Sequence, residues 1–255
     1  MQLMQYRHMP ELAEEFVAVL PRFGAAPALL DWAKSYARMH AGRCLWDAQF
    51  VGSYPVKRCL NVGGAPYMFE FALRRQFPRI DLTTIDLHPE RFPNAGDVLG
   101  VRILSADIES VAPTVAEKFD MIVFTEIFEH LRMDILTTMR RVRELLNDSG
   151  RLYLSMPNGM GWSSWRLHLL RGRSGPPMVE EWSKLSRLGH MGHVRLYSLR
   201  EATEVLVHCG FTIEQGGFRA VRRRHRNLRE LLQWVWPALA DEVIIVSKRE
   251  SMTPA

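Results

Sequence analysis

The spacing of hydrophobic positions changes near residue 58, and this change divides the chain into two kinds of structure. Residues 10–50 carry apolar side chains at helical spacing, with Pro21, Gly24 and Pro27 as breaks. Beyond them, short runs rich in β-branched and aromatic residues alternate with helical stretches. The composition of these runs is typical of strands. We therefore expect an N-terminal helical cap over residues 1–50 and an α/β domain over residues 51–255. The predicted strands are 59–64, 81–86, 101–107, 119–125, 150–156, 210–218 and 241–249.

The alternation of strands and helices predicts a parallel sheet with helices on both faces, because βαβ units cross over in a right-handed sense. In such a sheet a ligand lies at the carboxyl ends of the strands. Apolar positions from Leu131 to Leu146 predict one helix that stops at residues 147–150. Ser198 and Glu201 form a capping-box signature for a later helix, which ends near Gly210.

Two long connections follow the fifth and sixth predicted strands. Residues 157–195 are rich in Trp, Arg, Gly and Pro, and they indicate either an irregular functional insertion or disorder. Residues 218–240 begin with six arginines and continue as a basic amphipathic helix. Three interpretations of this helix stay open. Its apolar stripe packs on the domain, or its charge attracts an anionic substrate or an anionic membrane surface, or it binds nucleic acid.

Composition and charge narrow the class of protein. The chain has 255 residues and 47% hydrophobic content, which excludes a disordered, collagenous or disulfide-stapled protein. Cys44, Cys59 and Cys209 form no C-x-x-C pair, so we interpret them as buried hydrophobic residues. The net charge of +5 comes from residues 218–229, which hold six arginines and no acid. No apolar run is long enough for a membrane span and no signal-peptide pattern begins the chain, so we expect a cytoplasmic protein, with residues 219–239 as a candidate peripheral membrane contact.

A glycine turn follows the first strand of the α/β series. Gly63-Gly64-Ala65-Pro66 leads into a predicted helix from Met68 to Arg75, an arrangement that lets backbone approach a nucleotide-like ligand. The second strand ends at Asp86, whose carboxylate can accept hydrogen bonds from both ribose hydroxyls. The third ends at Asp107, which is placed to meet an adenine amino group. Each acid alone is equally consistent with a turn or a cap, but the three features in this order predict adenosine binding.

The first motif of the class I S-adenosylmethionine-dependent methyltransferases, approximately LDVGCGPG, resembles residues 60–67 of this chain, LNVGGAPY. The chain departs from it at Asn61, where the family has an acid, and at Ala65 and Tyr67, where it has glycines. The resemblance covers residues 43–215 and is greatest to the ubiquinone-pathway O-methyltransferases with a type 11/23 methyltransferase domain. It implies a doubly wound, Rossmann-like sheet of seven strands, with an antiparallel last strand and an insertion after the fifth.

The same resemblance implies S-adenosylmethionine as the cofactor. It also places residues 157–195 and 218–240 on the substrate side of the sheet. A nicotinamide cofactor is the weaker interpretation, because its G-x-G-x-x-G pattern requires glycines where this chain has Ala65 and Met68. The cofactor contacts that the resemblance implies are Arg43, Gly63, Gly64, Ala65, Asp86, Leu87, Asp107, Ile108, Thr125 and Glu126. For Arg43 the alternative is a solvated helix end.

A Glu-x-x-Glu-His segment, Glu126 to His130, follows the fourth strand and is similar to a recurrent E-V-L-E-H-L motif of this superfamily. Its three polar residues share a face if they form a first helical turn. Carboxylates and imidazoles suit Mg²⁺, Mn²⁺ or a similar cation, and residues 189–195 add His190 and His193. Similarity to the plant small-RNA terminal 2′-O-methyltransferase favours His193 as a further ligand. The candidate metal ligands are therefore Glu126, Glu129, His130 and His193.

Catalysis without a metal is the alternative. In that case Glu126 backs the cofactor pocket, and His130 or His193 is a candidate general base beside Glu129, because a neutral imidazole accepts a hydroxyl proton near pH 7. The implied reaction is in-line transfer of a methyl group to a hydroxyl oxygen of a glycan, a lipid-linked sugar or a natural-product-type small molecule, with an anionic or lipid-linked acceptor as one form. A non-catalytic adenosine-binding module and an RNA methyltransferase are the alternatives. No nucleic-acid-binding motif accompanies the charge, which argues against a nucleic-acid partner.

Overall fold

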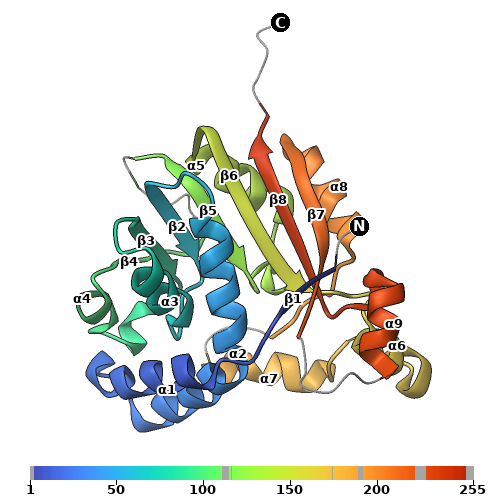
Figure 1. The fold of residues 1–255 in the computed structure, drawn as a ribbon, viewed down its shortest axis with the longest axis horizontal. Helices are drawn as coiled ribbons and strands as arrows, with labels where there is room; N and C mark the ends of the chain where they lie inside the picture. Colours follow the sequence, from blue (N-terminus) through green and yellow to red (C-terminus); the bar gives the residue numbers. More distant parts are fainter. Residues whose placement is uncertain are drawn as a thin grey trace, which may run out of the picture. The chain divides into compact units, whose positions relative to one another are not determined.

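The computed structural model describes residues 3–110, 115, 117–173, 175–188, 192–221 and 228–250. Its strands form an eight-stranded sheet in the order β1-β7-β8-β6-β5-β2-β3-β4 (Figure 1). β2 runs parallel to β3 and β5, and β3 runs parallel to β4, whereas β8 is antiparallel to both β6 and β7. The strands are β1 Leu3–Tyr6, β2 Arg58–Val62, β3 Asp81–Asp86, β4 Arg102–Ser105, β5 Phe119–Thr125, β6 Leu146–Pro157, β7 Phe211–Val221 and β8 Glu242–Arg249.

This architecture confirms the α/β fold with an antiparallel last strand, and the strand count is eight instead of seven. The additional strand is β1, a four-residue edge strand beside β7. The helices are α1 Pro10–Val19, α2 Pro27–Gly52, α3 Met68–Gln76, α4 Ala95–Leu99, α5 Ile135–Leu145, α6 Trp162–Arg171, α7 Met178–Leu188, α8 Leu199–His208 and α9 Leu228–Val235. Short 3₁₀ helices cover Leu20–Phe23, Pro89–Arg91, Phe128–His130 and Pro237–Leu239.

Contacts divide the chain into two compact units. One of them, here called the N-terminal unit, holds residues Tyr6–Val123. Within it α2 packs against α1 and α3, and the ring of Phe16 meets those of Phe23 and Phe71 edge to face, with centroids 5.8 and 5.3 Å apart. Pro10 and Pro27 stand in the first turns of α1 and α2, where the missing N–H group costs no hydrogen bond. The predicted boundary of a helical cap at residue 50 stays a prediction.

The second unit, here called the C-terminal unit, holds residues Phe124–Ala220 with α9 and β8. Its core is the β6–β8 ladder, in which Leu154 pairs with Ile245 and both are fully buried. The capping box at α8 is confirmed, because Ser198 accepts a hydrogen bond from the Glu201 amide and the Glu201 side chain accepts one from the Ser198 amide.

Two sequence-based boundaries in this unit are wrong. The helix predicted from Leu131 begins only at Ile135, because the Asp134 side chain accepts hydrogen bonds from the Leu136 and Thr137 amides and so caps α5. The residues predicted to end that helix, 147–150, belong instead to β6. The three cysteines are free and buried, as predicted.

The segment over residues 157–195 was predicted to be irregular, and this is also wrong, because it contains α6 and α7. Arg219, predicted as part of an exposed basic cluster, lies in β7 and is completely buried. Its Nε donates to Glu242 at 2.6 Å, and one of its terminal nitrogens donates to the Tyr153 hydroxyl at 3.3 Å. The arginines at 222, 223, 224 and 226 lie outside the described residues. Among the described helices, none has the length and apolar content needed to cross a bilayer.

Candidate functional site

The glycine turn of the N-terminal unit is held by the carboxylate of Asp86. Gly63 has φ +77° and donates its amide to the Ile85 carbonyl at 2.8 Å. The next two amides, of Gly64 and Ala65, both donate to Asp86 Oδ2, at 3.0 and 2.9 Å. The end of β3 therefore fixes the turn that follows β2. A rigid turn of this kind loses little conformational entropy when a ligand binds.

This arrangement refines the predicted role of Asp86. Its second oxygen, Oδ1, accepts the His88 amide at 2.9 Å, so three backbone N–H groups already bind the carboxylate. A carboxylate oxygen accepts about two hydrogen bonds. From the described contacts, Oδ2 is saturated and Oδ1 retains room for one further donor. The predicted contact of Asp86 to the ribose hydroxyls stays a prediction.

Gly64 and Tyr67 explain how the turn accommodates its departures from the family motif. A Cβ at Gly64 would lie 2.5 Å from Thr84, 2.6 Å from Glu70 and 2.7 Å from the Tyr67 ring, so only glycine fits. Tyr67 has φ +71°, a left-handed conformation that usually favours glycine. Its buried ring packs edge to face against Phe23 and Phe92, and this packing holds the conformation.

Glu70, on α3, is a residue at this turn that the sequence analysis did not identify. It is completely buried, and its Oε1 accepts hydrogen bonds from Asn61 Nδ2 at 2.7 Å and from Thr84 Oγ1 at 2.8 Å. Burial raises the pKa of Glu70 to about 7. The available signal was a single acid inside the apolar run Met68–Leu73, next to a motif that has lost its own acid at Asn61.

The other predicted cofactor contacts in the N-terminal unit stay predictions. Arg43 lies on α2, is only 3% exposed and donates to the Tyr36 hydroxyl at 2.8 Å, so the alternative of a solvated helix end is wrong. The Asp107 carboxylate accepts the Glu109 amide at 2.9 Å and the Ser110 hydroxyl at 2.8 Å, so it also orders its own turn. Two further candidates of this unit are Leu87, which is half-buried, and Ile108, which is buried.

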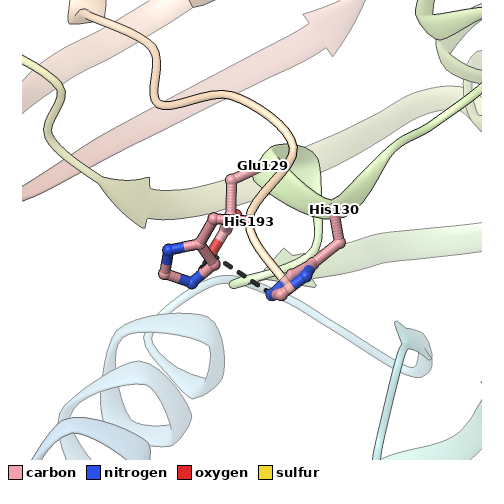
Figure 2. Close-up of side chains that lie close together, drawn as sticks. All are labelled: Glu129, His130 and His193. Atoms are coloured by element: carbon pink, nitrogen blue, oxygen red, sulfur yellow. Dashed lines mark ion pairs between the residues drawn. The ribbon is translucent and has the colours of Figure 1, made fainter. Parts of the chain in front are cut away.

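In the C-terminal unit, Glu129, His130 and His193 come together as a cluster, here called the Glu-His cluster (Figure 2). Each offers one ligand atom, and these atoms all lie within 4.8 Å of one another. Glu129 Oε1 lies 3.9 Å from Nε2 of both histidines. The carboxylate is buried, whereas the imidazoles keep 26% and 30% of their side-chain surface exposed. A small molecule therefore has access to the two rings.

Hydrogen bonds to backbone groups hold the segment that carries His193 against the segment that carries Glu129 and His130. The Val194 amide donates to the Glu129 carbonyl at 2.8 Å. The buried Glu181 carboxylate of α7 accepts the His193 amide at 2.5 Å, and Lys184 donates to the same carboxylate. A Cβ at Gly192 would meet the Glu181 carboxylate, so a larger residue there would displace this side chain. The loop that carries His193 is thus fixed from both sides.

The protonation of the two imidazoles follows from their surroundings. His130 Nδ1 lies 3.0 Å from the Gly192 carbonyl, which can only accept, so Nδ1 carries the proton of the neutral ring. Nε2 of His130 then holds a lone pair beside Glu129. Burial lowers the pKa of His193, which favours its neutral form. Among the described residues, none donates to or accepts from the buried His193 Nδ1.

Glu126 stands apart from the Glu-His cluster, and the predicted shared helical face is wrong for it. Glu126 has φ +57°, and the 3₁₀ helix begins only at Phe128, so Glu126 and Glu129 are not on one helical turn. Its amide donates to the Ser155 carbonyl at 2.9 Å, and its Oε1 lies 3.5 Å from the Ser155 hydroxyl. Thr125, the last residue of β5, is half-buried. His190 lies outside the described residues.

The parallel strands, the glycine turn and the acid at the end of β3 together form the arrangement found in nucleotide-binding α/β proteins. The chain belongs to the methyltransferase domain family, whose model matches residues 8–215. This confirms the class inferred from the first motif, a class I S-adenosylmethionine-dependent methyltransferase, with S-adenosylmethionine as the cofactor of the class. A search of the curated proteins gives no match.

Solved structures share the fold at low sequence identity. A candidate O-methyltransferase from Nostoc punctiforme is 15% identical with a TM-score of 0.57, covering 94% of this chain and 70% of its own. A candidate methyltransferase in complex with the Haloferax volcanii Trm112 methyltransferase activator is 14% identical with a TM-score of 0.57, covering 84% and 92%. An S-adenosylmethionine-dependent methyltransferase from Clostridium acetobutylicum is 11% identical with a TM-score of 0.54, covering 82% and 90%. These likenesses support the fold and leave the acceptor open.

Proposed function

We propose that this methyltransferase transfers a methyl group to a hydroxyl oxygen of a glycan, a lipid-linked sugar or a natural-product-type small molecule. The observation that carries the proposal is the Glu-His cluster, because a hydroxyl, unlike an amine, needs a base to remove its proton during attack. The cluster follows β5 and the glycine turn follows β2, and these strands are parallel neighbours in the sheet. Ligands of such sheets lie at the carboxyl ends of the strands.

The residues of the cluster have distinct roles in this proposal. His130 Nε2 takes the proton of the acceptor hydroxyl as its oxygen attacks, because Nδ1 is committed to the Gly192 carbonyl. Glu129, whose Oε1 lies 3.9 Å from Nε2 of both rings, is placed to stabilise the imidazolium that forms, and His193 is a second proton acceptor. When bound, S-adenosylmethionine supplies an electrophilic methyl group on its sulfonium sulfur. Alignment of the acceptor oxygen with that methyl group accounts for most of the acceleration.

The experiment that tests this function is an unbiased search for the acceptor. Purified protein and S-adenosylmethionine with an isotopically labelled methyl group are added to a whole-cell extract, and mass spectrometry identifies components that gain one labelled methyl. We expect the label on an oxygen. A methyl found on nitrogen or carbon would contradict O-methylation, and cofactor binding without any methylated product would favour the non-catalytic module. Loss of the product after ribonuclease treatment would favour the RNA alternative.

The Glu-His cluster also supports a second candidate, a divalent cation held by Glu129, His130 and His193. One buried carboxylate and two imidazoles within 4.8 Å form a donor set that suits Mn²⁺, Zn²⁺ or Fe²⁺. His130 meets a further requirement, because metal-bound histidines usually donate their other N–H to a carbonyl, as Nδ1 does toward Gly192. A cation bound there would lower the pKa of an acceptor hydroxyl.

Direct binding measurements test the cation independently of activity. We expect Mn²⁺ to bind the intact protein with a stoichiometry of one, measured by calorimetry, and Glu129→Ala to abolish this binding. Glu204→Gln, on the exposed face of α8, is the matched control and should bind as the wild type does. Equal Mn²⁺ binding by wild type and Glu129→Ala would contradict a site at this cluster. Full methyl transfer in excess chelator would contradict a catalytic role of the cation.

A further inference from the structure

Helices α6 and α9 of the C-terminal unit expose apolar side chains, whereas an ordinary surface helix buries its apolar side. α9 buries Glu230 and Gln233, at 9% and 2% exposure, and turns its apolar residues outward. Leu228, Leu231 and Val235 recur at helical spacing and are 70%, 52% and 69% exposed. Of the three interpretations left open for this helix, packing of the stripe on the domain does not hold for these residues. On α6, which buries none of its residues, Trp165, Leu169 and Leu170 are likewise exposed.

One residue, Asp241, holds both helices in this orientation. Its Oδ1 accepts the hydroxyl of Ser163 on α6 at 2.8 Å. Its Oδ2 accepts Gln233 of α9 at 3.2 Å and pairs with Arg229 of α9. Gln233 also donates to the Leu239 carbonyl at 3.1 Å. These polar contacts bring α6 and α9 side by side, as Figure 1 shows. The outward apolar face is thus a fixed feature of the fold.

The exposed side chains of these two neighbouring helices are here called the α6–α9 face. Its apolar members are Trp165, Leu169, Leu170, Leu228, Leu231, Trp234, Val235 and Trp236, each more than one-third exposed. Large apolar side chains exposed in this number on two neighbouring helices indicate an interaction site on a folded protein. α6 adds the exposed cations Arg166 and Arg171, and residues 157–179 contain no acid at all. Four more arginines immediately precede α9 in the sequence.

We propose that the α6–α9 face seats the protein on an anionic lipid surface. Tryptophan and leucine beside arginine are the composition of helices that lie in the interface of a bilayer, with aromatic rings at headgroup depth and cations on anionic headgroups. A second copy of the chain fits less well, because a symmetric dimer would bring two arginine-rich faces of like charge together. The proposal is independent of the methyl acceptor and of the Glu-His cluster.

Vesicle flotation of the full chain tests the proposal. We expect the wild type to float with vesicles that contain about one-third phosphatidylglycerol in phosphatidylcholine, to bind phosphatidylcholine alone far more weakly, and to dissociate as salt rises. Two double variants remove apolar contacts, Leu231→Gln with Trp234→Gln on α9, and Trp165→Gln with Leu169→Gln on α6. Each pair should lower vesicle affinity by more than about tenfold, since two buried apolar side chains are lost.

The controls separate lipid binding from misfolding and from protein association. Val207→Gln changes an exposed apolar residue of α8, at 54% exposure, and should leave flotation unchanged. Arg166→Gln with Arg171→Gln should weaken binding to anionic vesicles by about fivefold per charge and leave the weak neutral binding as it is. Failure of the wild type to float with anionic vesicles overturns the proposal whatever the variants do. So does flotation unaffected by both apolar pairs, or a dimer in light scattering that forms through this face without lipid binding.

Discussion

Asn61 and Glu70 show that the acid of the first motif has an alternative source in this chain. The hydrogen bond between Asn61 and Glu70 brings a carboxyl group from α3 to the end of β2, beneath Gly64. In the described structure Glu70 Oε2 and the Tyr67 hydroxyl are buried without hydrogen-bond partners, so the turn rests on a polar cluster that is only partly satisfied. The stability of such a cluster depends on the size and on the charge of its side chains, and a substitution at Gly64 and one at Glu70 test these two properties.

Replacement of Gly64 tests the size constraint. Gly64→Ala places a methyl group within 2.7 Å of Thr84, Glu70 and Tyr67, so the turn must shift. We expect a loss of about 1–3 kcal/mol in the free energy of unfolding, as in other overpacked sites, together with at least a tenfold loss of S-adenosylmethionine affinity. Urea unfolding and calorimetry measure the two effects. Gly175→Ala is the control, because nothing lies within 4 Å of its added Cβ; if the two variants behave alike, the account of the turn is wrong.

Replacement of Glu70 tests the charge constraint. Because burial raises the pKa of Glu70 from 4.5 to about 7, the folded state holds a proton that the unfolded state has lost between these values. Its contribution to stability is therefore full below pH 4.5 and is lost as pH rises through 7, by up to about 3 kcal/mol. Glu70→Gln removes this titration, so its stability relative to wild type should increase by that amount from about pH 5 to about pH 8.

Urea unfolding at several pH values measures the difference for Glu70→Gln. Glu204→Gln, an exposed carboxylate on α8, should differ from wild type by the same small amount at every pH. A constant difference for Glu70→Gln as well would show that Glu70 is ionised in the folded protein throughout this range.

His130 allows its structural and catalytic roles to be separated. In His130→Asn the amide nitrogen can replace Nδ1 as the donor to Gly192, whereas the basic Nε2 is lost. We expect kcat to fall by a factor of about 10²–10⁴ while the melting temperature and the S-adenosylmethionine affinity change little. His208→Asn, at the exposed end of α8, should retain full activity. Wild-type kcat in His130→Asn would remove His130 as the base.

At the scale of elements, the sequence was most informative where local chemistry and burial agree. The strands of the α/β series were predicted to within a few residues, because each contains a short run rich in β-branched, aromatic or other apolar residues. The α8 capping box was readable from Ser198 and Glu201 alone, since both hydrogen bonds lie within four residues. The helix α9 was predicted from its periodicity, but periodicity does not reveal that its apolar residues face outward. The helices α6 and α7 were not predicted, and many of their apolar residues are exposed as well.

Long-range contacts account for the other differences between sequence and structure. Arg219 was counted with an exposed basic cluster because no local pattern reveals that Glu242, 23 residues away, pairs with it in the sheet. His193 joined Glu129 and His130 through family resemblance, and the structure supports that grouping while separating Glu126 from it. Glu70, on α3, was overlooked because its partners, Asn61 and Thr84, belong to two strands, β2 and β3.

The cap of α8 gives a prediction at this scale. Ser198→Ala removes the side chain that accepts the Glu201 amide, and the measured cost of losing such a cap is about 1 kcal/mol. We expect the free energy of unfolding to fall by that amount without a change in methyl transfer. Ser183→Ala, inside α7, should be neutral because its hydroxyl only bonds back to the Glu180 carbonyl of its own helix. Equal effects of the two variants would contradict the role of the capping box.

At the scale of the whole molecule, the net charge of +5 does not show which of the basic residues are paired with acids and which are exposed. Arg219 and Arg229 are neutralised by Glu242 and Asp241 inside the C-terminal unit. On α6, the exposed Arg166 and Arg171 stand among exposed apolar side chains. The proposed anionic lipid partner rests on this combination of exposed cations and exposed apolar side chains.

The central claim is that the rigid glycine turn of this methyltransferase binds its cofactor. Calorimetric titration of the intact protein with S-adenosylmethionine and with S-adenosylhomocysteine measures this most directly. We expect one site per chain, a Kd of about 1–100 μM for both molecules, and a loss of at least tenfold in Asp86→Ala, which frees the Gly64 and Ala65 amides. The absence of binding below about 1 mM for both molecules would contradict the account.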